Sequence, residues 1–210
     1  MKNLAVLLML SVSVFSFGQK KEKYPTIKIG AVLPMAEKEL KDVSGDFYSL
    51  QSLVDENGLL VMFSCNTCPF VVGSGDANEG WDGRYEEIYE WCDENNVGFA
   101  LLNPNEAKRD LGDSFDDMVA RSEEMGWTCK HLLDENSELA NAFGGKTTPH
   151  CFLFNNESTL VYEGAIDDNH KSATEAKEHY LKDALKNLVE GETIDPNKTN
   201  AVGCSIKRMM

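Results

Sequence analysis

The most constraining feature of this 210-residue chain is an apolar run that leads directly into a pair of cysteines. Residues 59–63 read Leu-Leu-Val-Met-Phe, and Cys65, Cys68 and Pro69 follow within six positions. An apolar run of this length without alternation predicts a strand covered on both faces, as in the centre of an α/β sheet. The sequence therefore places a C-x-x-C pair at the end of a buried central strand.

Strand-like and helix-like segments alternate along the rest of the chain. A glycine-rich loop at 73–83 interrupts the segment after the cysteines, and the last helix ends at Gly191. The order β-α-β-α-β-β-α predicts one α/β domain, with a central mixed sheet flanked by helices, an N-terminal β extension and a C-terminal tail. The helices are expected around 85–92, from Ser114, at 134–143 and at 180–189, and the further strands at 97–102, 151–154 and 160–163.

The charge of the chain excludes some classes of partner. It carries 35 acidic and 20 basic residues, for a formal net charge of −15. Such a surface repels phosphate backbones and anionic lipid headgroups. No nucleic-acid partner and no peripheral membrane role are therefore expected.

The N-terminus has the pattern of an export signal. Lys2 precedes an apolar and small-residue run at 4–17, and Ser16 and Gly18 suit a cleavage site before Gln19. The run of about 14 residues is shorter than the roughly 20 that span a bilayer as a helix, although an uncleaved anchor is the alternative. We expect a signal peptide at 1–18, a domain at 19–191 and a tail at 192–210, in a protein that is periplasmic or secreted and soluble after export.

The spacing of Cys65 and Cys68 is compatible with a redox pair, a structural disulfide or half of a zinc site. No second C-x-x-C or paired histidines supply the other two zinc ligands, so no metal site is assigned. At a strand-to-helix junction, backbone N–H groups favour thiolate over thiol. This position favours a redox pair in which an exposed Cys65 attacks a disulfide and Cys68 resolves the mixed disulfide.

A second signal lies before the strand at 151–154. Thr148-Pro149 is a candidate cis peptide bond, because proline removes most of the trans preference; an ordinary trans turn is the alternative. His150 follows directly and is expected near the cysteine pair. There it could tune Cys65 or join the pair in binding copper(I), unless it is a partly exposed loop residue.

Four further cysteines lie elsewhere in the chain. Cys92 and Cys151 fall at apolar positions and are expected to be buried, inert thiols. Cys129 lies in a predicted turn, and its role stays open. Cys204, in the Gly-Cys-Ser segment of a tail expected to be mobile, is either passive or an accessory thiol that reaches another cysteine.

These motifs together resemble a known family. The strand ending in Cys65-x-x-Cys68-Pro69-Phe70, with Thr148-Pro149-His150, is similar to thioredoxin-like proteins. More narrowly, the chain resembles the peroxiredoxin-like branch of the alkyl hydroperoxide reductase/thiol-specific antioxidant (AhpC/TSA) group. That narrower likeness adds Ile166-Asp167-Asp168-Asn169 and Gly203-Cys204-Ser205-Ile206-Lys207, and it spans about residues 27–208.

The resemblance implies a thioredoxin fold with Pro149 in cis against the cysteine pair and the backbone of Thr148 presented to an extended substrate. It also implies a substrate that is a protein or small-molecule thiol or disulfide, with no cofactor.

Three departures from the motifs of these families limit the reactions that we expect. Val61 and Cys65 replace the proline and threonine of the peroxidatic motif, whose cysteine would be Cys68, and no arginine lies near Pro149 in the sequence. Leu59 replaces the buried acid of thioredoxin.

We therefore expect a thiol–disulfide oxidoreductase. A peroxiredoxin-like thiol peroxidase is the alternative enzyme, and a copper-binding chaperone that uses Cys65, Cys68 and His150 is the non-enzymatic alternative.

Overall fold

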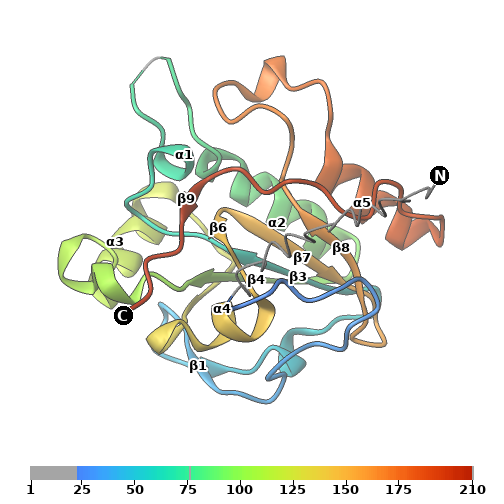
Figure 1. The fold of residues 1–210 in the computed structure, drawn as a ribbon, viewed down its shortest axis with the longest axis horizontal. Coiled ribbons are helices and arrows are strands. Elements are labelled where there is room, and N and C mark those ends of the chain that lie inside the picture. Colours follow the sequence, from blue (N-terminus) through green and yellow to red (C-terminus); the bar gives the residue numbers. More distant parts are fainter. Residues whose placement is uncertain (1–22, 76, 210) are drawn as a thin grey trace, which may run out of the picture.

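The structure is a computed structural model that describes residues 23–75 and 77–209. Its centre is a mixed five-stranded sheet in the order β5-β4-β3-β7-β8 (Figure 1). The strands β3, β4 and β5 run parallel, whereas β7 pairs antiparallel with both β3 and β8. The strands are β3 (Gly58–Phe63), β4 (Val97–Asn103), β5 (Lys130–Leu133), β7 (His150–Phe154) and β8 (Leu160–Gly164).

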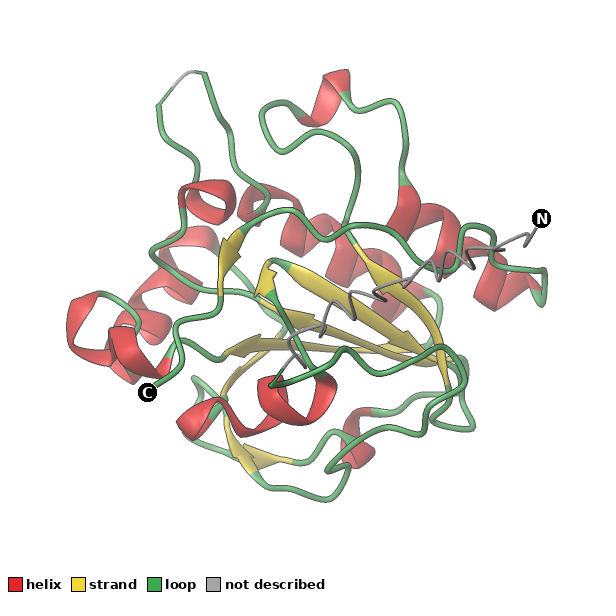
Figure 2. Ribbon diagram, in the orientation of Figure 1, coloured by secondary structure: helices red, strands yellow, loops and turns green. Residues whose placement is uncertain are grey.

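Helices cover both faces of this sheet (Figures 1 and 2). On one side lie α2 (Tyr85–Glu94) and α5 (Tyr180–Glu190), and on the other lies α4 (Glu138–Phe143). Two further helices, α1 (Pro69–Val72) and α3 (Phe115–Met125), complete the set of α-helices in the described part of the chain. Every residue of β3 is buried, as the unbroken apolar run predicts.

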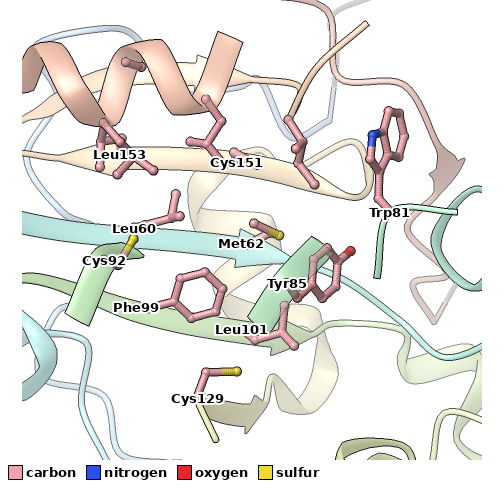
Figure 3. Close-up of a cluster of buried hydrophobic side chains, with 14 of the residues drawn as sticks. Leu60, Met62, Trp81, Tyr85, Cys92, Phe99, Leu101, Cys129, Cys151 and Leu153 are labelled. Carbon is pink, nitrogen blue, oxygen red and sulfur yellow. The ribbon is translucent and has the colours of Figure 1, made fainter. Parts of the chain in front are cut away.

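Successive side chains of β3 enter two different cores, because side chains along a strand alternate between its faces. Leu60 and Met62 pack under α2 and α5, in a cluster that includes Cys92 and Cys151 (Figure 3). Leu59, Val61 and Phe63 enter the second cluster, against α4 and the N-terminal extension. Four phenylalanines stack edge-to-face there, namely Phe63, Phe143, Phe152 and Phe154.

Local sequence signals set most helix ends where they are expected. Ser114 and Asp117 form a reciprocal capping box at the start of α3, and Gly191 ends α5 in the left-handed conformation. The predicted helix at 134–143 is shorter than expected. Asn136 and Ser137 have positive φ angles that separate a 3₁₀ turn, η4 (Glu135–Ser137), from α4. The buried carboxylate of Asp134 instead accepts hydrogen bonds from the Leu139 and Ala140 amides.

The sequence pattern predicts only some of the shorter elements. The edge strand β5 was missed because its four residues begin with Lys130 and His131, which give no apolar alternation. A hairpin of β1 (Leu40–Lys41) and β2 (Phe47–Tyr48) forms the N-terminal β extension that the sequence predicts. The remaining short elements are η1 (Gln51–Leu53), η2 (Asp82–Arg84), η3 (Glu106–Leu111), η5 (Ala173–Glu175), β6 (Thr147–Thr148) and β9 (Cys204–Ser205).

The chain end is the largest departure from expectation. Instead of forming a mobile tail, residues 203–208 lie across the domain, and β9 pairs with β6 beside α1 (Figure 1). Ile206 is buried in the second core cluster. The predicted signal peptide at 1–18 lies outside the described residues. Within 23–75 and 77–209, no helix combines the length and apolar character needed to cross a membrane.

The aromatic stack makes a testable contribution to stability. Phe143 contacts the rings of Phe63, Phe152 and Phe154 at centroid distances of 5.4, 5.2 and 5.8 Å. We expect Phe143→Ala to lower the free energy of unfolding by about 3–5 kcal/mol, because it leaves a cavity in a packed core. Urea unfolding followed by circular dichroism measures this change. The matched control is Phe47→Ala on the exposed hairpin, where the loss should stay within about 0.5 kcal/mol; equal losses would contradict the assignment.

Candidate active site

The cysteine pair lies in the loop that joins β3 to α1. Ser64, the first residue after β3, bonds through its amide to the Leu102 carbonyl and through its hydroxyl to the phenol of Tyr85 (2.9 Å). These contacts hold the start of the loop against β4 and α2. Both cysteine side chains are then buried, each with 3% of its surface exposed. Cys65 is therefore not the exposed member of the pair that the sequence predicted.

A buried carboxylate holds the middle of the loop. Asp113 accepts hydrogen bonds from the Asn66 amide and the Thr67 hydroxyl, both at 2.7 Å. The side-chain amides of Asn103 and Asn105 donate to the same carboxylate. Four donors thus satisfy a group that would otherwise be costly to bury. Asp113 lies 45 or more positions from the cysteines in sequence, and no motif pointed to it.

Thr148 contacts both sulfurs from the opposite strand. Its hydroxyl lies 3.0 Å from Cys65 Sγ, and its carbonyl oxygen lies 3.6 Å from Cys68 Sγ. The Thr148–Pro149 peptide bond is cis, as predicted. The structure therefore brings together the four residues that the sequence singled out as the central site: Cys65, Cys68, Thr148 and Pro149.

The two sulfurs differ in their preference for charge. A hydrogen bond from the Cys65 thiol lowers the pKa of Cys68, and donors from Cys204 and the Phe70 amide lower it further. The same Cys65–Cys68 hydrogen bond, together with burial and the negative charge of Asp113, raises the pKa of Cys65. Of the two sulfurs, Cys68 is therefore the one whose surroundings favour the thiolate, and Cys65 the one whose surroundings favour the thiol.

The sequence analysis expected the thiolate at Cys65 instead, and Pro69 gives a structural reason for the difference. Proline is favoured in the first turn of a helix, since its missing N–H has no partner there anyway. Helix α1 consequently begins at Pro69, and Cys68 becomes its N-cap residue. Cys65 lies a further three residues back, in the loop held by Asp113. The position of the proline was the sequence signal that could have identified Cys68.

Comparison with solved structures places this geometry among known folds. An uncharacterised conserved protein from Geobacillus kaustophilus is 26% identical over 91% of this chain and 98% of its own, with a TM-score of 0.78. A hypothetical protein from Sinorhizobium meliloti is 24% identical over 90% of this chain and 99% of its own, with a TM-score of 0.76. Neither description states an activity. No protein-family model and no curated protein sequence matches the chain.

More distant structures identify the fold. Peroxidoxin BcpB from Mycobacterium tuberculosis is similar at a TM-score of 0.54 and 14% identity, over 77% of this chain and 96% of its own. The chain has a thioredoxin-like fold. The expected thioredoxin fold, with a central mixed sheet and flanking helices, is confirmed.

Within the thioredoxin-like domain, His150 does not face the cysteine pair. It is the first residue of β7 and is buried, with 2% of its surface exposed. Its Nε2 lies 3.0 Å from a carboxylate oxygen of Glu163, and its Nδ1 accepts the Lys146 amide at 3.2 Å. Both ring nitrogens are therefore engaged. The expectation of a partly exposed loop residue is wrong, and the groups that both ring nitrogens contact are Glu163 and the Lys146 amide rather than the cysteines.

The cysteines of the core follow the sequence prediction. Cys92 and Cys151 are fully buried in the first core cluster (Figure 3), and burial raises the pKa of both thiols. Burial also raises the pKa of Cys129 to about 12. Cys204 is different, because its backbone N–H donates to Cys68 Sγ at 3.3 Å. The tail thus contributes a third cysteine to the site.

The placement of the proton can be tested by titration. We expect the thiolate absorbance of the reduced protein to show one group that ionises below the ordinary thiol pKa of about 8.5. Cys68→Ser should remove this step. Cys65→Ala should move it to higher pH, because the thiol that donates to the Cys68 thiolate is lost. Cys65→Ser, which keeps a donor, is the matched control and should shift it less. A step that persists in Cys68→Ser would refute the assignment.

Proposed function

We propose that this chain is a thiol–disulfide oxidoreductase that acts outside the cytoplasm through Cys65 and Cys68. The main observation behind this proposal is that Thr148 contacts both sulfurs and so holds the two cysteines together. The pKa of one thiol is raised and that of the other is lowered. Disulfide exchange requires a thiolate to attack and a neighbouring thiol to complete the reaction. The site supplies both from its own side chains.

The solved structures of similar fold agree with redox chemistry in general. One is described as a peroxidoxin and another as a secreted disulfide oxidoreductase from Mycobacterium tuberculosis. The substrates we propose are disulfides of proteins or small thiols. Export is supported by the charged and apolar N-terminal pattern at 1–18, and no nucleic-acid partner is proposed for a chain with a net charge of −15.

The proposal predicts the result of an insulin-reduction assay with dithiothreitol as the electron source. The protein should accelerate precipitation of the insulin chains, and Cys68→Ser should return the rate to that of dithiothreitol alone, because the attacking thiolate is gone. Cys92→Ala is the matched control, since it removes a buried thiol outside the site and should keep the activity. Full activity in Cys68→Ser would exclude the proposed function.

A thiol peroxidase is the second candidate, and one observation favours it. The residue with the lowered pKa, Cys68, occupies the position of the peroxidatic cysteine in the resemblance described above. However, the groups that contact its sulfur are thiols and backbone groups, not the guanidinium that would stabilise a bound peroxide.

Peroxide consumption separates the two candidates. With hydrogen peroxide and dithiothreitol, we expect the protein to add no more to the rate than an equal concentration of free thiol does. An oxygen-electrode or dye assay measures this rate directly. A large acceleration that Cys68→Ser abolishes would instead make the peroxidase the primary function.

A further inference from the structure

The edge of β6 beside the cysteine pair is already occupied by the protein's own chain. Strand β9 lies beside β6 (Figure 1). Thr147 pairs with Ser205 and Thr148 pairs with Cys204, in antiparallel register. A free strand edge at this place could receive an extended peptide by adding a strand. The tail takes that position, and it brings a cysteine to the point on the edge nearest Cys68.

Cys204 lies within bonding reach of Cys68. Its amide nitrogen donates to Cys68 Sγ at 3.3 Å, and the same sulfur helps to raise the pKa of the Cys204 thiol. With an N–Cα bond of about 1.5 Å, the Cα atom of Cys204 is at most about 4.8 Å from that sulfur. Cys204 is also partly exposed, whereas Cys65 and Cys68 are buried.

The segment after Cys204 is fixed to the domain by specific contacts. Ile206 is buried and donates its amide to the Lys146 carbonyl, and the Lys207 amide donates to Asn105 Oδ1. Asn105 in turn donates to Asp113, the carboxylate that holds the loop between Cys65 and Cys68. One hydrogen-bond network therefore sets the position of the tail relative to the cysteine pair.

On the N-terminal side of Cys204, the tail lies so close to Thr148 that position 203 requires a glycine. A Cβ atom on Gly203 would lie 2.1 Å from the Thr148 carbonyl oxygen, which is far inside van der Waals contact. No other residue type has room at this position without displacing the tail. Cys204 is thus held in register from both sides, which favours an intramolecular reaction with Cys68.

We propose that Cys204 is a third redox-active thiol that resolves mixed disulfides formed on Cys68, an inference that rests on the exchange activity proposed above. In the first step, the Cys68 thiolate attacks a substrate disulfide R–S–S–R′. The Cys68–S–S–R bond forms, the S–S bond of the substrate breaks, and R′S⁻ leaves and takes up a proton.

In the second step, Cys204 gives up its proton to solvent, and its sulfur attacks Cys68 Sγ. The Cys68–Cys204 disulfide forms and RS⁻ leaves and is protonated. Two protein thiols are oxidised and one substrate disulfide is reduced to two thiols. Cys65 can then attack Cys68 Sγ, which forms Cys65–Cys68 and frees Cys204 with no net redox change. Cys68 is the sulfur shared by both protein disulfides.

The test uses the reduced Cys65→Ser protein and 5,5′-dithiobis(2-nitrobenzoate), a coloured disulfide probe, in excess over the protein. Cys68 should release one thionitrobenzoate per chain on forming the mixed disulfide, and resolution by Cys204 should release a second. The product should carry no adduct, and peptide mapping should find a Cys68–Cys204 link. Burial raises the pKa of the Cys92, Cys129 and Cys151 thiols, so they should react far more slowly than Cys68, whose pKa is lowered.

The matched control is Cys65→Ser/Cys204→Ser, which should release one equivalent and retain the adduct on Cys68. If Cys65→Ser alone also stops at one equivalent with the adduct on Cys68, the role of Cys204 is refuted while the exchange function stands. If Cys65→Ser releases nothing from Cys68, both proposals fail.

A second variant tests the position of the tail without removing a sulfur. Gly203→Ala in the Cys65→Ser background should slow the second release at least about tenfold relative to the first, because the misplaced thiol loses its effective concentration. An unchanged ratio of the two rates would show that the β6–β9 pairing does not position Cys204 for the reaction.

Discussion

The site depends on the register between β3 and β7. Phe63 pairs with His150 across the two antiparallel strands, so the chain leaving β3 meets the chain entering β7. The residues just beyond this pair are the cysteine loop on one side and Thr148-Pro149 on the other. A shift of one residue would turn the β3 side chains to the opposite faces of the sheet and exchange the two cores. The fully buried strand therefore fixes the position of the sulfurs as well as the packing.

The two sulfurs of the loop that follows β3 have different electrostatic surroundings. The Asp113 carboxylate lies beneath Asn66 and Thr67, and its charge disfavours a thiolate at Cys65. Cys68 receives donors instead, from the Cys65 thiol, the Phe70 amide and the Cys204 segment. The buried acid that thioredoxin places in the central strand is Leu59 here. The carboxylate of Asp113, from another part of the chain, lies beside the loop instead. The four groups that donate hydrogen bonds to it hold it in place.

The C-terminal tail contributes both to the stability of the fold and to the geometry of the site. Ile206 is buried in a core cluster and Arg208 donates to the Gly145 carbonyl, so the chain end cannot leave β6 without exposing apolar surface and breaking hydrogen bonds. The same contacts hold Cys204 beside the cysteine pair. A substrate strand could take the Thr148 edge only by displacing them, which distinguishes this thioredoxin-like domain from one with an open edge.

The sequence by itself determined the features that depend on local chemistry. Residues 59–63 had to form a covered strand, Ser114 and Asp117 had to begin a helix, and Cys65, Cys68, Thr148 and Pro149 were recognisable by type and spacing. The burial of Cys92 and Cys151 followed from their apolar positions.

Tertiary structure decided what depends on residues distant in the sequence. Asp113, in the segment before α3, accepts a hydrogen bond from the cysteine loop. Glu163 hydrogen-bonds His150, and Cys204 contacts Cys68 from the end of the chain. The short strand β5 and the pairing of β6 with β9 exist only because neighbouring chain segments supply hydrogen-bond partners. The location of the proton on the cysteine pair is set by the sum of these contacts. For that reason the sequence could single out the cysteine pair, but not the sulfur whose surroundings favour the thiolate.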